Sequence, residues 1–206
     1  MRLFVAVRPP ENVLEHAADA LAAVVGAAGH DGRGPIRWTP PENRHVTLGF
    51  YGEVPDGLLD EVAGRVSDVA GRTAPLILEL RGAGVFSGRT LWLGVAGEVD
   101  ALVALGRQVV RIGEDLTGRR DERPRSRPHM TVGRIRVSST GRHGRHRDAA
   151  GPLTSMVRAL ALYQGPAWTV DRVHLVRSEP GRGRSGGPLY TDLAGPDLGA
   201  GPVGAD

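Results

Sequence analysis

Apolar residues recur along this chain at two spacings, and the spacing separates the expected helices from the expected strands. Stripes with a period near 3.6 residues predict helices over residues 11–28, 57–70, 101–116 and 153–162. Short alternating or continuous apolar runs predict strands over residues 3–7, 36–39, 45–50, 76–86, 91–95, 129–137 and 168–176. Asp100 is the expected N-cap of the third helix. This mixture of helices and strands is typical of an α+β fold.

One short pattern occurs twice, at residues 44–50 (RHVTLGF) and at residues 128–134 (PHMTVGR). Polar and apolar residues alternate in each copy, as in a strand with one buried face, so the histidine and the threonine project from the same side. Glycine is the next residue on that side in both copies, and a strand glycine often marks a close approach of a ligand. We therefore expect two matching shelves, His45-Thr47-Gly49 and His129-Thr131-Gly133.

Two imidazoles suit a reaction in which one group removes a proton and another supplies one, because the ordinary histidine pKa lies near ~6.5. Phosphodiester transfer to water or to an adjacent hydroxyl is such a reaction. The hydroxyls of Thr47 and Thr131 are suited to hold the non-bridging phosphoryl oxygens, and no metal is required. For one copy, a strand with a polar outer face is the simpler interpretation. The second matched copy favours a catalytic pair, His45 with His129.

The two motifs belong to a longer repeat, because each follows a strand and a helix in the same order. The offset between His45 and His129, 84 residues, is too long for a solenoid unit and fits two duplicated α+β lobes. We expect one bilobal domain over residues 1–195, with two antiparallel-sheet lobes, outer helices and a pseudo-twofold axis that places the motifs across a central cleft. Residues 196–206 are expected to form a disordered tail.

The pattern His-hydrophobic-Thr-hydrophobic, present twice, resembles the two-histidine phosphoesterase superfamily. Within it, the chain is similar to the RNA 2′,3′-cyclic phosphodiesterases once called 2′-5′ RNA ligases (the LigT or ThpR family). The similarity extends to MRLFVAV (1–7), IRWTPPENRH (36–45), LGFYGEV (48–54), RPH (127–129) and PLYTDL (188–193).

The resemblance implies the bilobal fold and the opening of an RNA terminal 2′,3′-cyclic phosphate to a 2′-phosphate, without cofactor or metal. The implied substrates are RNA 3′ ends or small cyclic nucleotides. It also implies that His45 is the proton donor and His129 the proton acceptor. The two near-equivalent motifs do not distinguish these roles by themselves.

Three further residues are candidates for substrate binding. Arg127 has the strand parity of His129. Arg134 has the parity of the apolar residues, unless a bulge at Gly133 shifts the register. Phe50 is suited to stack on a base, as related enzymes suggest, although its position in the alternation favours the core.

Charge is distributed unevenly, although the net charge is only +3. All 26 basic residues are arginine, and residues 119–147 hold 10 arginines against 2 acidic residues, a net +8 around His129. Such a belt favours a phosphate-rich partner, whereas coding bias is the alternative explanation. The chain has no cysteine, which excludes disulfides and thiolate chemistry. No apolar run approaches the roughly 20 residues that cross a bilayer, and we expect a cytoplasmic monomer.

The remaining histidines predict no second site. His143 and His146 fall in an expected loop over residues 138–151 without a third ligand, which favours a solvated loop over a metal site. His174 is expected to be a surface or hydrogen-bonded strand histidine.

Two functional alternatives stay open at this point. One is another two-histidine reaction, such as 2′-5′ ligation or cleavage, or the opening of a cyclic nucleotide. The other is a non-catalytic module that binds RNA ends. Intact histidine and threonine at all four motif positions favour an enzyme.

Overall fold

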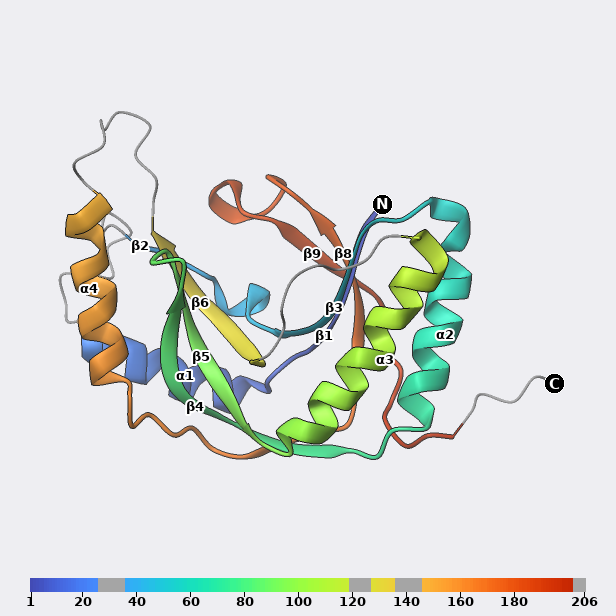
Figure 1. Ribbon diagram of the computed structural model, residues 1–206, viewed down its shortest axis with the longest axis horizontal. Coiled ribbons are helices and arrows are strands. Elements are labelled where there is room, and N and C mark those ends of the chain that lie inside the picture. Colours follow the sequence, from blue (N-terminus) through green and yellow to red (C-terminus); the bar gives the residue numbers. More distant parts are fainter. Residues whose placement is uncertain (26–35, 119–126, 136–145, 202–206) are drawn as a thin grey trace.

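A curled sheet of nine strands, with helices packed against one face, forms the structure (Figure 1). The computed structural model describes residues 1–25, 36–118, 127–135 and 146–201. The strands are β1 (Arg2–Val7), β2 (Ile36–Trp38), β3 (Val46–Glu53), β4 (Leu76–Phe86), β5 (Thr90–Gly97), β6 (His129–Ile135), β7 (Trp168–Val170), β8 (His174–Glu179) and β9 (Leu189–Ala194). The helices are α1 (Glu11–Val25), α2 (Leu59–Gly71), α3 (Val99–Thr117) and α4 (His146–Ala159), with 3-10 turns η2 (Pro41–Asn43), η3 (Asp56–Leu58) and η4 (Arg184–Gly186). The expected α+β class is confirmed.

The strand order places the two motif strands side by side. It runs β7-β4-β5-β6-β3-β1-β8-β9, with β2 paired to β6, and the paired strands are antiparallel. β3 and β6 meet at the centre, where Val46 is paired with Met130. β3 follows β1 and α1, and β6 follows β5 and α3, so the two lobes repeat one order of elements within a shared sheet. The twofold symmetry itself stays a prediction.

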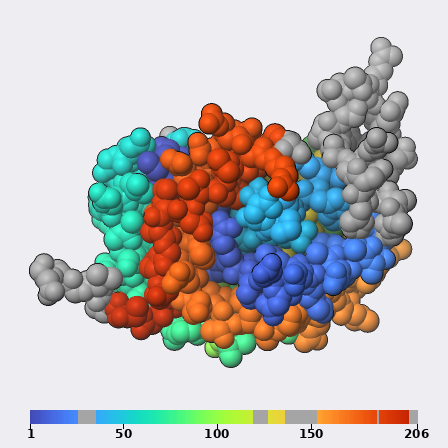
Figure 2. All heavy atoms as spheres, turned by 180° about the vertical axis from the view of Figure 1, so that it is seen from behind, coloured from blue at the N-terminus to red at the C-terminus, as the bar shows by residue number. Residues whose placement is uncertain are grey.

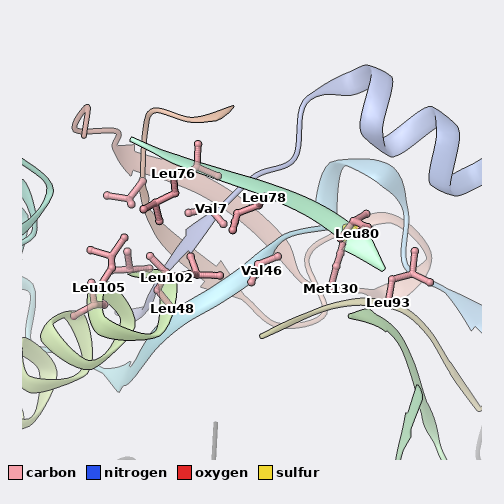
Figure 3. Close-up of a cluster of buried hydrophobic side chains, with 14 of the residues drawn as sticks. Val7, Val46, Leu48, Leu76, Leu78, Leu80, Leu93, Leu102, Leu105 and Met130 are labelled. Atoms are coloured by element: carbon pink, nitrogen blue, oxygen red, sulfur yellow. The ribbon is translucent and has the colours of Figure 1, made fainter. Parts of the chain in front are cut away.

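The hydrophobic core lies between the sheet and the helices. Val46, Leu48 and Met130 of the motif strands point into this core, and Figure 3 shows Leu48 near Leu102 of α3 and Met130 near Leu80 of β4 and Leu93 of β5. α3 covers β3 and is itself covered by α2, whereas α4 covers β4 and contacts α1. The duplicated lobes thus have their helices on the outside, as expected. No helix of the described residues is long and apolar enough to span a membrane.

The opposite face of the sheet carries the motif histidines and threonines. Because Val46 and Met130 point toward the helices, their neighbours along each strand project from the other side. These neighbours are His45, Thr47, His129 and Thr131, and we call this surface the histidine face. A second apolar cluster formed by Phe4, Ala6 and Val176, with Phe50 and Tyr190 against it, lies on the same face, since the Phe4 ring contacts His45.

Three local expectations are wrong. α3 begins at Val99 with Glu98 in the N-cap position, so Asp100 lies in the first turn and is not the cap. The single strand expected over residues 168–176 is divided: β7 pairs with β4, whereas β8 pairs with β1 in the other half of the sheet. α4 begins at His146, within the expected loop. His143 lies outside the described residues.

The end of the chain is packed and not disordered as far as residue 201. Leu198 is only 5% exposed and belongs to the core, and Asp197 forms an ion pair with Arg172 at 2.7 Å. Backbone amides of Gly199 and Gly201 donate to carbonyls at the end of α2, and Figure 2 shows this dark red segment against the side of the molecule. The expected tail is therefore wrong for residues 196–201, and residues 202–206 lie outside the described residues.

Candidate active site

Each motif strand contains a β-bulge immediately after its threonine. In β3, Thr47 is paired with Ala6 and Gly49 with Val5. The chain thus advances by two residues in β3 and by only one residue in β1. The same skip occurs in β6, where the register shifts between the partners of Thr131 and Gly133. The residue after the threonine and the glycine that follows it are both buried in each copy. The alternation therefore reverses at the same point in both motifs.

The bulges bring the last residue of each motif back to the histidine face. Phe50 is half-buried against the Phe4 cluster on the histidine face and not in the main core, where the alternation placed it. Its contact with substrate stays a prediction. Arg134 is exposed, and its positive charge acts on both His45 and Tyr190. The bulge at Gly133, without which Arg134 would face the core, is therefore present. Above the ring of Phe50 lies the guanidinium of Arg2, 4.9 Å from the centroid.

The motif glycines serve packing on the helix side and do not extend the shelves. A side-chain carbon on Gly49 would lie 2.5 Å from Cγ1 of Val109 in α3. One on Gly133 would lie 2.8 Å from Cγ2 of Ile36 in β2. The interpretation of these glycines as room for a ligand is wrong, because the bulge turns them away from the histidine face.

The two histidines are oriented by the same kind of hydrogen bond. Nδ1 of His45 lies 2.9 Å from the carbonyl oxygen of Asn43, and Nδ1 of His129 lies 2.9 Å from the carbonyl oxygen of Arg127. A carbonyl only accepts, so Nδ1 carries the proton in both rings. In a neutral ring with this tautomer, Nε2 is the nitrogen without a proton. Asn43 is itself fixed, since its Nδ2 donates to the carbonyl of Pro188 at 3.1 Å.

Aromatic rings from neighbouring strands enclose both imidazoles. The ring centroid of His45 lies 4.8 Å from that of Phe4 in β1 and 5.4 Å from that of Tyr190 in β9. The centroid of His129 lies 4.7 Å from that of Phe86 in β4 and 6.0 Å from that of Trp92 in β5. These contacts limit the rotation of each ring. No sequence pattern indicated them, apart from the place of Tyr190 in the closing segment of the family resemblance.

Burial and positive charge lower the pKa of His45 to about 4. Loss of hydration is the main cause, and the charges of Arg8, His129 and Arg134 act in the same direction, against the hydrogen bond to Asn43. A histidine with a lowered pKa is neutral at pH 7. The electrostatic influence of His129 and Arg134 on His45 also means that both motifs contribute to one site.

A cluster formed by Arg8, Asp192 and His174 adjoins His45. Arg8 donates to Oδ1 of Asp192 at 2.7 Å and to the carbonyl oxygen of Glu42 at 2.9 Å. Nδ1 of His174 lies 3.1 Å from Oδ2 of the same carboxylate, which confirms the expected hydrogen-bonded strand histidine. Burial lowers the pKa of His174, as does the charge of Arg8. Arg8 was not predicted as a site residue.

Arg127 and the two motif threonines, the remaining candidates, differ in exposure. Arg127 is exposed, and its carbonyl oxygen accepts the hydrogen bond from His129. Thr47 and Thr131 are half-buried on the histidine face. Among the described residues, no group of three or more histidine, aspartate or glutamate side chains has the geometry of a metal site.

Two solved structures have a fold similar to that of this chain. The crystal structure of TT0787 from Thermus thermophilus is similar with a TM-score of 0.67 and 26% identity, over 98% of this chain and 99% of that one. Apo LigT of E. coli shares the fold, with a TM-score of 0.64 at 23% identity over 96% of both chains.

Sequence relatives extend along nearly the whole chain. The RNA 2′,3′-cyclic phosphodiesterase of Methanothermobacter thermautotrophicus is 30% identical over 200 residues, which cover 94% of this chain and 96% of that protein. The protein of the same name from Thermus thermophilus is 30% identical over 201 residues, 94% of this chain and 88% of that one. The family model of the 2′-5′ RNA ligase superfamily matches residues 9–182. The chain belongs to the 2′-5′ RNA ligase superfamily.

Proposed function

We propose that this protein hydrolyses the 2′,3′-cyclic phosphate at the 3′ end of RNA and leaves a 2′-phosphate. The observation that carries the proposal is the pair of imidazoles on one face, each tethered through Nδ1 to a backbone carbonyl. Relatives that are 30% identical over nearly the whole chain have the name RNA 2′,3′-cyclic phosphodiesterase. The substrate class is thus an RNA 3′ end or a small cyclic nucleotide.

In the proposed reaction, Nε2 of His129 accepts a proton from water as the water oxygen forms a bond to phosphorus. The bond between phosphorus and the 3′ oxygen breaks, and Nε2 of His45 donates a proton to that oxygen. The products are a 2′-phosphate and a 3′-hydroxyl. Thr47 and Thr131 hold the non-bridging oxygens and stabilise the pentacoordinate phosphorus, which is the charge-stabilising part of the mechanism.

The donor role of His45 depends on the substrate. With a pKa of about 4, the imidazole is neutral in the free protein at pH 7 and has no proton to give from Nε2. A phosphate anion beside the ring favours the protonated form, because an opposite charge nearby raises the pKa of a histidine. We therefore propose that the site takes up a proton when it binds the cyclic phosphate. Binding then prepares the acid, and His129 serves as the base in this proposal.

This proton uptake has a direct physical signature. Calorimetric binding of a 2′-nucleotide in buffers of different ionisation enthalpy should show net uptake near pH 7, since His45 is neutral before binding. His45→Ala should abolish that uptake while leaving the fold intact. Binding without proton uptake by the wild type would mean that the donor is charged beforehand.

Residues around the histidines have supporting roles in this proposal. Arg134 contributes positive charge toward the phosphate, since its charge already reaches His45. Phe50, held under Arg2, offers a ring for the terminal base. Arg127 contributes its carbonyl to His129, and its exposed side chain adds charge at the border of the site. Both motifs belong to one chain, so we propose a monomer. Because RNA is the proposed substrate, we also propose that the protein acts in the cytoplasm.

The test is the incubation of the protein with a short RNA that ends in a 2′,3′-cyclic phosphate. In water enriched in oxygen-18, the product should be a 2′-phosphate that carries one heavy oxygen. A 3′-phosphate product would contradict the assigned leaving group. Unchanged RNA, with binding intact, would mean that the protein is a binding module. A longer RNA joined through a 2′-5′ linkage would favour ligation, the reverse chemistry.

A further inference from the structure

Two arginines on neighbouring strands lie together at the border of the histidine face. Arg37 of β2 is paired directly with Arg134 of β6, and directly paired residues project from the same face with Cβ atoms about 5 Å apart. Ile36 and Trp38 pack against the core on either side of Arg37. Arg37 therefore points away from the core. The bulge at Gly133 gives Arg134 the same direction.

Arg37 also reaches the turn that precedes β9. A side-chain carbon on Gly187 would lie 3.0 Å from Nη2 of Arg37, so the guanidinium lies against a residue that has no side chain. The next residue, Pro188, accepts the hydrogen bond from Asn43, and Tyr190 two positions later contacts His45. The guanidinium is thus situated where β2, β6 and the turn before β9 meet, beside the site.

The two arginines are placed differently around the site. The charge of Arg134 acts on His45, whereas the guanidinium of Arg37 lies on the far side of this pair, against Gly187 in the turn before β9. Like charges directly opposite each other destabilise a sheet, but two adjacent guanidiniums offer a fork of N–H donors that matches the oxygens of a phosphate. The pair is suited to a second phosphate, next to the reacting one.

We propose that Arg37, together with Arg134, binds the phosphodiester that joins the terminal nucleotide of the substrate to the preceding one. This rests on the proposed function, which places the terminal cyclic phosphate between His45 and His129. The neighbouring phosphodiester is the nearest second anion that such an RNA provides. Arg37 is then a specificity residue, which makes the protein prefer RNA of two or more nucleotides over a cyclic mononucleotide.

The test compares two substrates with the same terminal nucleotide: 2′,3′-cyclic AMP and the dinucleotide ApA that ends in a 2′,3′-cyclic phosphate. Arg37→Ala should lower kcat/KM for the dinucleotide by about 10-fold or more, the usual loss for a charge-assisted hydrogen bond. It should leave kcat/KM for 2′,3′-cyclic AMP within about twofold, because that substrate lacks the second phosphate. The loss should appear in KM, and Arg37→Lys should restore part of it.

Arg111→Ala is the matched control, since Arg111 is an exposed arginine on α3, on the opposite side of the sheet. It should leave kcat/KM unchanged for both substrates. The unfolding temperature and circular dichroism spectrum of Arg37→Ala should show that the variant is folded. Equal losses on both substrates, or no loss on the dinucleotide, would overturn the inference.

The proposed function and this inference fail in different ways. If the wild type turns over neither substrate, the proposed function fails. Dissociation constants for the 2′-phosphorylated products, ApA 2′-phosphate and 2′-AMP, then decide the inference. Weaker binding of ApA 2′-phosphate alone in Arg37→Ala supports it, and unchanged binding overturns it.

Discussion

Substitution of Gly49 by alanine tests the role that the structure gives to the motif glycines. The added Cβ would lie 2.5 Å from Cγ1 of Val109 and 3.5 Å from the carbonyl carbon of the same residue. Favourable carbon contacts begin near ~3.5 Å, so the Val109 methyl must move by about 1 Å. α3 resists this shift, because the hydroxyl of Tyr51 donates to the carbonyl of Val109 at 3.0 Å. We expect a loss of about 1–3 kcal/mol in the free energy of unfolding, the usual cost of overpacking.

Chemical and thermal unfolding measure this loss. For a chain of this size, the melting temperature should fall by roughly 2–4 °C for each kcal/mol. Gly49→Ala combined with Val109→Ala should be more stable than the sum of the two single changes predicts, because the second change removes the clashing methyl. Gly64→Ala is the control: its Cβ would meet nothing within 4 Å in α2, and the change should stabilise the helix by about 1 kcal/mol.

The opposite result would support the expectation that Gly49 leaves room for a ligand. If Gly49→Ala leaves the unfolding free energy unchanged and raises KM, the residue borders the substrate. The bulge in β3 would then be placed wrongly.

Three further predictions concern charge and protons. The pKa of His45 in the folded protein lies below its ordinary value of 6.5, so its contribution to stability is complete above pH 6.5 and is lost as the pH falls toward 4. The melting temperature should therefore fall as the pH is lowered through this range, and a flat profile would contradict the burial of the ring. Cyclic phosphodiesterase activity should survive EDTA, because the two imidazoles perform both proton transfers, and loss of activity restored by a divalent metal would refute that mechanism. Binding of a ten-nucleotide RNA should depend more steeply on salt than binding of a cyclic mononucleotide, because residues 119–147 carry a net +8; equal slopes would mean that this belt does not contact RNA.

The parts of the fold that depend on local alternation were predictable from the sequence. His45 and Thr47 share a face with His129 and Thr131 because alternation along a strand is set by neighbouring residues. The helices have the expected order and faces for the same reason, since each carries a single apolar stripe. The duplication added the information that the two strands belong to one site.

The departures arise from contacts between distant segments. The bulges in β3 and β6 accompany the packing of Gly49 against α3 and of Gly133 against β2, so alternation alone placed Phe50 on the wrong face. The aromatic rings around the histidines come from four other strands and carry no local pattern. Residues 196–201 were expected in a tail, yet the buried Leu198 and backbone hydrogen bonds to α2 hold the segment.

The most direct test of the two-histidine mechanism is the rate of cyclic phosphate hydrolysis by His45→Ala, by His129→Ala and by the double variant, with folding confirmed by circular dichroism. Each single change should reduce turnover by roughly 10²-fold to 10⁴-fold, the usual contribution of a positioned acid or base. The double variant should lose far less than the product of the two, because residues that act as a unit are not additive. Near-native turnover by either folded single variant would contradict the placement of the active site on the histidine face.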